Sequence, residues 1–105
     1  MFIAIYSFKV RPGAEKNFER SWRDLTELIY EYEGSLGSRL HISEPGTYIA
    51  YAQWPDRKTW EHAGKNLPER AKTVSQQMKD SCEKAETIYQ LEVIDDLLKD
   101  QIHAI

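Results

Sequence analysis

Cysteine is nearly absent from this chain of 105 residues, since Cys82 is the only one. One thiol cannot close an internal disulfide, and it cannot alone provide the roughly four ligands of a structural zinc site. A long apolar run is missing as well: no stretch approaches the roughly 18 uncharged apolar residues that a membrane-spanning helix needs. We therefore expect no disulfide scaffold and no membrane partner, and we expect Cys82 to lie in a helix or in the core.

A concentration of positive charge is also missing. The 14 Lys and Arg residues are spread along the chain beside 17 Asp and Glu residues, which gives a formal net charge of -3. Nucleic-acid binding needs a basic face, so no nucleic-acid partner is expected. The sequence also lacks a phosphate-binding glycine loop, a dinucleotide fingerprint, a metal-binding histidine pair and a nucleophile elbow. It therefore assigns no residue to a cofactor and none to a metal.

The composition that is present is that of one ordinary globular domain. Hydrophobic residues make up 41% of the chain and charged residues 30%, which is typical of a folded protein of this size. The apolar N-terminal segment MFIAIYSFKV lacks a basic start and is interrupted by Ser7 and Lys9. It is therefore expected to be a strand rather than a signal peptide, and the protein is expected to be cytoplasmic.

The first half of the chain predicts a strand, a helix and a hairpin. Residues 2–10 are rich in aromatic and branched side chains, with Tyr6 on one face and Ile5 on the other. Apolar residues three or four apart predict an amphipathic helix over 14–32, ended by Gly34. Residues 35–43 and 47–54 are predicted strands, joined by a tight turn at 44–46.

The second half predicts two further helices, a last strand and a tail. Asp56 suits the N-cap of a short helix that ends at Gly64. A second helix is predicted from Pro68 to about Cys82, followed by a strand over about 87–94. Residues 95–105 have apolar side chains at roughly helical spacing and are expected to form a short helix.

This order of elements predicts a ferredoxin-like split βαβ fold of the α+β class, a four-stranded antiparallel sheet with its helices on one face. The other face carries Ile3 and Ile5 and needs a cover, because monomers seldom expose so large an apolar patch. A homodimer with its two sheets packed face to face, a dimeric α/β barrel, provides that cover. A small-molecule pocket is then expected between sheet and helices, where Tyr6, Trp22 and Trp60 meet.

Three segments, FKVRPGAEKNFERSW, GSLGSRLHIS and YIAYAQWPDRKTWEHA, resemble the antibiotic biosynthesis monooxygenase superfamily. The resemblance extends over nearly the whole chain and implies one domain over 1–105, a dimeric α+β barrel and the pocket described above. It does not fix the reaction, because the superfamily includes cofactor-independent oxygenases, haem-degrading enzymes and an isomerase. The haem-degrading branch uses an Asn, a Trp and a His at positions that here are Tyr6, Ala63 and Thr73. Haem degradation is therefore not expected.

Oxygenation without a cofactor needs a base near neutral pH and an enclosed apolar site. His62 is the candidate catalytic base, one residue from the superfamily's His position at Ala63, whereas His41 is expected at an edge or interface. Aromatic walls suit a planar substrate, although each of these side chains also suits plain packing or capping. The candidate substrate-binding residues are Tyr6, Trp22, Tyr51, Trp60 and Asn66.

Three functions remain open at this point. The leading hypothesis is a cofactor-independent monooxygenase that acts on a small aromatic or quinol-like compound. The first alternative is a non-catalytic homodimer of the same fold that binds a small molecule or serves as a scaffold. The second alternative is an isomerase that shares the base but not the oxygen chemistry.

Overall fold

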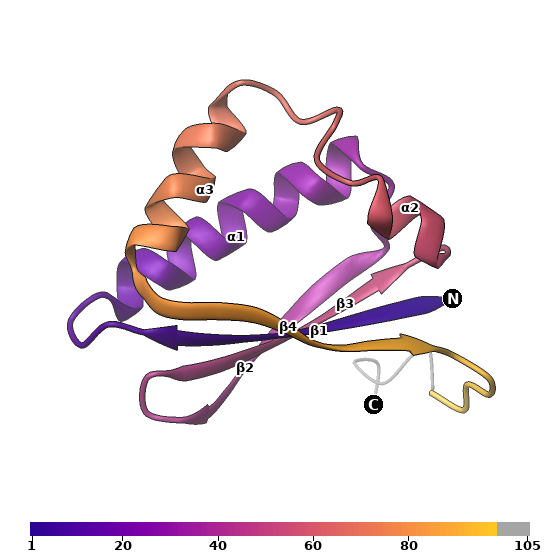
Figure 1. Cartoon of the computed structure of the whole chain (residues 1–105), viewed down its shortest axis with the longest axis horizontal. Helices are drawn as coiled ribbons and strands as arrows, with labels where there is room; N and C mark the ends of the chain where they lie inside the picture. Colours follow the sequence, from indigo (N-terminus) through magenta and orange to yellow (C-terminus); the bar gives the residue numbers. More distant parts are fainter. Residues whose placement is uncertain (99–105) are drawn as a thin grey trace, which may run out of the picture.

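A computed structural model describes residues 1–98, and it confirms the predicted order of elements (Figure 1). The sheet has the strand order β2-β3-β1-β4, and all of its neighbouring strands are antiparallel. The strands β1 and β3 are central, and β2 and β4 are the edge strands. The elements are β1 (Phe2–Val10), α1 (Glu15–Tyr32), β2 (Gly37–Glu44), β3 (Thr47–Trp54), α2 (Arg57–Glu61), α3 (Arg70–Asp80) and β4 (Cys82–Glu92).

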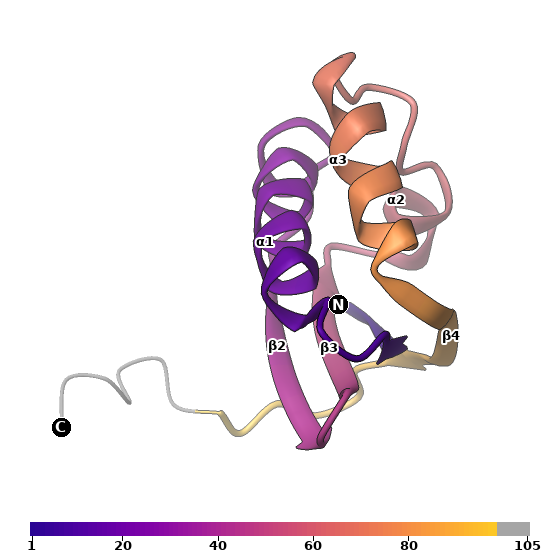
Figure 2. The same cartoon turned by 90° about the vertical axis from the view of Figure 1, so that its left-hand side faces the viewer.

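The helices all lie on one face of the sheet. Figures 1 and 2 show α1 and α3 side by side above the strands, with α2 close to the end of β3. The α+β ferredoxin-like fold is thereby confirmed. No helix within residues 1–98 is both long enough and apolar enough to cross a membrane.

Local sequence explains where α1 begins and ends. Its buried residues Phe18, Ser21, Leu25 and Leu28 are three or four positions apart, which fixes the face that packs on the sheet. The chain leaves the helix through Gly34, whose φ of 78° is a left-handed conformation that favours glycine. The C-terminus predicted for this helix is therefore confirmed.

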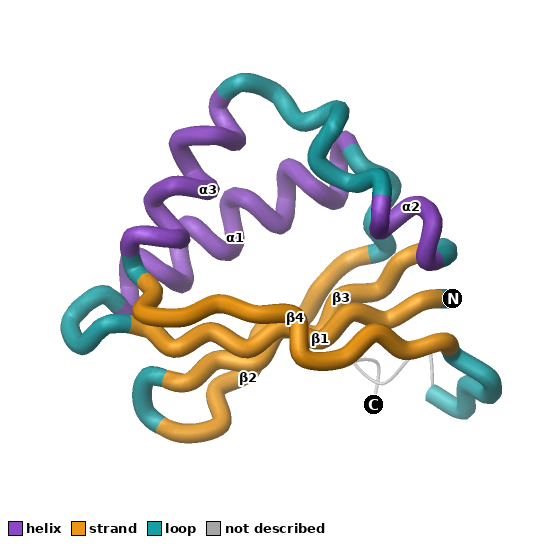
Figure 3. The backbone as a smooth tube through the Cα atoms, in the orientation of Figure 1, coloured by secondary structure: helices purple, strands orange, loops and turns teal. Residues whose placement is uncertain are grey.

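The two tight connections in the middle of the chain also follow the sequence (Figure 3). The turn between β2 and β3 contains Pro45 and Gly46, and Gly46 has a φ of 82°. The Asp56 carboxylate caps α2 by accepting the backbone N–H of Thr59 at 2.8 Å. This backbone hydrogen bond, together with one from the Thr59 hydroxyl, lowers the pKa of Asp56 below its usual value.

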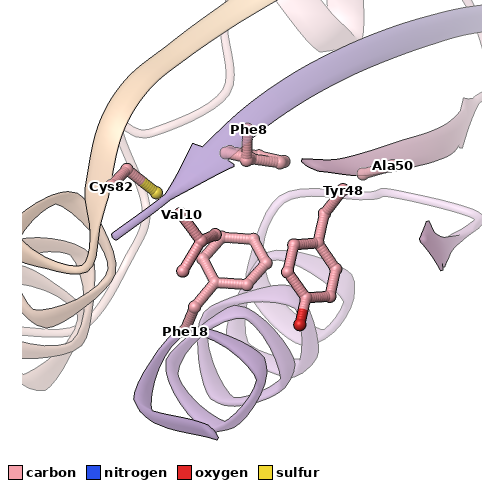
Figure 4. Close-up of a cluster of buried hydrophobic side chains, with 6 residues drawn as sticks. All are labelled: Phe8, Val10, Phe18, Tyr48, Ala50 and Cys82. Carbon is pink, nitrogen blue, oxygen red and sulfur yellow. The ribbon is translucent and has the colours of Figure 1, made fainter. Parts of the chain in front are cut away.

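The main core cluster joins the first helix to three strands (Figure 4). Its buried members are Phe8, Val10, Phe18, Tyr48, Ala50 and Cys82. The Tyr48 hydroxyl donates to a Glu19 oxygen at 2.6 Å. This hydrogen bond at the edge of the cluster links β3 to α1. This bond and the neighbouring negative charge raise the pKa of Tyr48 to about 12.

The end of the chain differs from the prediction. The strand β4 begins at Cys82 rather than at residue 87, so Cys82 is a buried strand residue and not the last residue of a helix. Residues 83–86 have helical composition, but pairing of β4 with β1 from Val10 onward overrides that propensity. Charged side chains suit this position because β4 is an edge strand.

The predicted tail helix is not seen in its described part. Residues 95–98 are not helical, and residues 99–105 of that prediction lie outside the described residues. Acidic residues at 95–96 suited a helix start, but Leu97 and Leu98 are 89% and 75% exposed and therefore have no packing partner among the described residues to hold such a helix.

The sheet face opposite the helices carries an apolar region around Ile5. Ile5 pairs with Tyr51 on one side and Tyr89 on the other, and Ile3 pairs with Leu91, so these residues share that face. Tyr89 is 59% exposed and Leu91 is 45% exposed in the single chain. This outer face carries the composition that the sequence predicted for it.

Candidate functional site

A cavity of about 270 Å³ lies between the helices and the sheet, where the sequence predicted a pocket. Most of its walls are side chains from the inner faces of β1 and β3 and from the buried stripe of α1. We call it the inner cavity. Its lining residues are Tyr6, Phe8, Trp22, Leu25, Thr26, Ile29, Ser35, Ser38, Ala52, Trp54 and Met78.

One polar group of a residue that lines the inner cavity is the hydroxyl of Tyr6. The indole N–H of Trp60 donates to this oxygen at 2.7 Å, from the side of α2. Since that bond occupies a lone pair of the Tyr6 oxygen, the hydroxyl hydrogen is free to turn toward another acceptor. Burial raises the pKa of Tyr6, and the Trp60 bond lowers it by a smaller amount. Tyr6 is therefore a protonated donor at neutral pH.

Contacts with Phe2 fix the position of the Trp60 ring. The two ring centres are 5.1 Å apart, and the Arg57 guanidinium lies 4.7 Å from the centre of the Phe2 ring. Arg57 also donates to Gln90 on β4 at 2.7 Å. The position of the Tyr6 hydroxyl thus depends on the docking of α2 against the sheet.

A buried carboxylate fixes the loop that follows α2. Glu33 is 7% exposed, and its two oxygens accept the backbone N–H groups of Gly64 and Asn66. Such charge-assisted bonds are about twice as strong as neutral ones. Glu33 therefore joins the end of α1 to the connection between α2 and α3.

The structure brings together only part of the predicted site. Tyr6 and Trp22 line the inner cavity, while Trp60 contacts Tyr6 without lining the cavity itself. Tyr51 lies on the opposite sheet face, where its hydroxyl donates to Gln53 at 3.3 Å. Its odd position in β3 places it there, since the buried alternate residues of that strand face the helices.

His62 and Asn66 are not brought to the inner cavity. His62 is an exposed residue at the C-terminal end of α2, and Asn66 is exposed in the loop that Glu33 holds. The short helix presents Trp60 to the sheet, so a residue two positions later faces another way. The expected base is thus absent from the cavity wall.

Several lining residues were not singled out from the sequence. Thr26 and Ile29 follow Trp22 at spacings of four and seven residues, so they share its helix stripe. Ser38 lies on the inner face of β2, two residues before Leu40, which packs on the core. The periodicity of the helix and of the strand predicts that these residues face inward. A small polar residue that faces inward does not by itself indicate a cavity.

The chemistry of the inner cavity is that of an uncharged apolar chamber with a few hydroxyl groups. Among the residues that the structure describes, none that lines the cavity is Asp, Glu, Lys, Arg or His. Within residues 1–98, no three His, Cys, Asp or Glu side chains gather where they could hold a metal ion. Such a chamber favours an uncharged planar ligand with an acceptor for the Tyr6 hydroxyl.

A comparison with protein families matches residues 1–76 to the family described as antibiotic biosynthesis monooxygenase. A search among curated proteins finds no match. The match contains the first three strands, the first two helices and every lining residue of the inner cavity except Met78.

Solved structures of similar fold include SnoaB from Streptomyces nogalater, described as a cofactor-independent oxygenase. Its chain superposes with a TM-score of 0.75 at 15% identity, covering 93% of this chain and 97% of its own. The Rv0793 protein of Mycobacterium tuberculosis superposes with a TM-score of 0.71 at 13% identity, covering 92% and 98%. At these identities the likeness establishes the fold and leaves the substrate open.

Proposed function

Because the chain belongs to the antibiotic biosynthesis monooxygenase family, we propose that it is a cofactor-independent monooxygenase that oxidises a small aromatic or quinol-like compound in the inner cavity. The observation that carries the proposal is the apolar chamber itself, which is lined by Tyr6, whose hydroxyl is held by a hydrogen bond from Trp60. The description of SnoaB as a cofactor-independent oxygenase on the same fold supports it.

The proposed reaction balances without a cofactor. A quinol with an unsubstituted ring carbon supplies all the electrons: one atom of dioxygen forms a new carbon–oxygen bond, the other leaves as water, and the product is a hydroxyquinone. The reactive species is the electron-rich anion of the substrate, so the site must favour its oxygen. The Tyr6 hydroxyl, oriented by Trp60, is the group proposed to donate to that oxygen.

The proton of the reacting hydroxyl has no side-chain base to accept it among the described lining residues, since Tyr6 is the only titratable one of them and is itself protonated. We therefore propose that this proton passes to water, and we assign no role to His62. It also requires a substrate whose own hydroxyl is acidic. An isomerase, which must remove a proton from carbon, is disfavoured on the same ground.

The lack of a base favours a second candidate function, the binding of a small molecule without turnover. Both candidates use the inner cavity and the same uncharged planar ligand. For either one we propose a cytoplasmic homodimer in which the outer faces of two sheets pack together. The apolar pairs Ile5 with Tyr89 and Ile3 with Leu91 support this arrangement.

Two measurements on the purified protein separate these functions. Oxygen uptake is recorded with a panel of quinols, and binding of hydroxymethylanthraquinone is followed by quenching of tryptophan fluorescence. Saturable binding with oxygen uptake supports the oxygenase, and saturable binding without uptake by any quinol supports the binding protein. If the probe does not bind and no quinol is consumed, both functions are contradicted.

A further inference from the structure

A second hollow lies beside the inner cavity, between α1 and β2. This hollow, here called the outer groove, has a volume of about 640 Å³ and lies at that edge of the sheet. Thr26 from α1 and Ser38 from β2 line both the inner cavity and the outer groove. These two residues therefore stand at the boundary between the inner cavity and the outer groove. Figure 2 shows α1 running above β2 at this edge.

The side chain of Tyr30 lies in the wall of the outer groove. Tyr30 is 60% exposed and lines the outer groove together with Gly37. A Cβ atom on Gly37 would lie 3.7 Å from the Tyr30 ring, so the ring rests close to the backbone at the start of β2. The Tyr30 side chain can change its rotamer without disturbing the core, because it is not part of a buried cluster.

The charged residues that line the outer groove, among those the structure describes, have one sign. Glu27 and Glu31 line the outer groove, are exposed, and stand one helical turn apart on α1. Neither carboxylate forms an ion pair with a residue in the described part of the chain. Within residues 1–98, no Lys or Arg lines the outer groove or the inner cavity. An anion would therefore meet repulsion outside and would find no compensating charge inside.

We propose that the gap between Thr26 and Ser38 is the passage through which ligands reach the inner cavity, and that the two glutamates beside it select uncharged ligands over anionic ones. The inference rests on the proposed function, because it concerns access to the same cavity. It adds a substrate class, planar aromatic molecules without a carboxylate or sulfonate, and it assigns the selection to Glu27 and Glu31.

The passage is tested by rates of binding to the full-length protein, measured by stopped-flow fluorescence with hydroxymethylanthraquinone. Thr26→Phe narrows the gap, so the association and dissociation rates should both fall, by about tenfold or more, while the equilibrium constant changes less. Thr73→Phe, the same change at an exposed site on α3, is the control and should leave both rates unaltered. Unchanged rates in Thr26→Phe would overturn the passage.

The charge selection is tested with the matched anion, anthraquinone carboxylate. In Glu27→Gln/Glu31→Gln its association rate should rise by about tenfold at low salt, and the gain should vanish in about 1 M salt, where the Debye length is about 3 Å. The rate for the uncharged probe should not change. Glu44→Gln/Glu61→Gln removes equal charge at exposed sites outside both hollows and should have no effect on either probe.

The outcomes separate this inference from the proposed function. One outcome is that the uncharged probe binds the wild-type protein saturably while neither Thr26→Phe nor Glu27→Gln/Glu31→Gln alters the binding kinetics of either probe. In that case the passage and the charge selection are wrong, and binding in the inner cavity is not contradicted. If the uncharged probe does not bind the wild-type protein at all, the proposed function is wrong as well.

Discussion

A single hydroxyl group connects the fold of this protein to its proposed chemistry. Tyr6 lies on the central strand β1, faces the helices, and accepts the Trp60 indole N–H at 2.7 Å. The alternation along a strand predicted the side that Tyr6 faces, and the helix stripe predicted that of Trp22. The Tyr6–Trp60 bond was not predictable, because it joins residues 54 positions apart and depends on how a five-residue helix docks.

Replacing Tyr6 with Phe should weaken binding of hydroxymethylanthraquinone by about tenfold, since one hydrogen bond of about 1.4 kcal/mol is lost. Trp60→Phe keeps a ring but removes the donor. It should weaken binding less and should raise the pKa of Tyr6, because the Trp60 bond now lowers that pKa. Fluorescence titration measures the binding, and ultraviolet titration follows the tyrosine. Equal affinity in Tyr6→Phe and wild type would remove Tyr6 from the site.

Tyr48 predicts how stability depends on alkaline pH. Its pKa is raised from 10.0 to about 12, so above pH 10 the folded state retains a proton that the unfolded state releases. The stability that this provides is complete below pH 10 and is lost as the pH rises toward 12. Urea unfolding between pH 9 and pH 12 should therefore show a steeper loss in wild type than in Tyr48→Phe.

The control for this pH dependence is Tyr32→Phe, which changes an exposed tyrosine in the last turn of α1. Its stability should follow the wild-type curve. The role of the Tyr48–Glu19 bond would be contradicted if Tyr48→Phe lost stability as steeply as the wild type over this range.

At the scale of elements, the sequence predicted most of the fold because most elements carry their own boundary signals. Pro45 and Gly46 set the hairpin, Asp56 caps α2, and Gly34 ends α1. The start of β4 carries no such signal, since residues 83–86 are charged and the strand is set by pairing with β1. Tertiary pairing decides where β4 begins, so the local sequence pattern predicted its first residue too late in the chain.

The link between α1 and the loop after α2 predicts a stability effect. In Glu33→Gln an amide replaces a carboxylate that accepts two backbone N–H groups, and one of those donors then faces an NH₂ group. The free energy of unfolding should fall by about 2 kcal/mol, measured by urea denaturation. Amide exchange at Gly64 and Asn66 should become faster.

Glu61→Gln provides the matched control, since Glu61 is exposed at the end of α2. Its effect on the free energy of unfolding should stay within about 0.5 kcal/mol, as for most surface substitutions. Equal stabilities of Glu33→Gln and wild type would show that the loop is held by other contacts.

At the scale of the whole molecule, the unequal faces of the sheet predict a dimer. One face is covered by helices, and the other presents Ile5 with its partners Tyr51 and Tyr89. Light scattering should give about twice the chain mass of 12.3 kDa. Ile5→Asp should lower that mass or unfold the protein, because an unpaired charge buried at the interface costs several kcal/mol.

Thr73→Asp introduces the same charge at an exposed site on α3 and should remain a dimer. A monomeric wild-type protein would contradict the proposed assembly. A dimer in which Ile5→Asp is as stable as the wild type would place the interface on another surface.

The most direct test of the account is turnover in isotopically labelled dioxygen, with a quinol that the oxygen-uptake panel selects. The wild-type protein should place one labelled atom in the product and the other in water. Ala52→Leu fills the inner cavity and should slow labelling by about tenfold or more, whereas Ala14→Leu, in a separate hollow between α1 and α3, should not. Absence of label in the wild-type product, or equal labelling by both variants, would contradict oxygenation in this cavity.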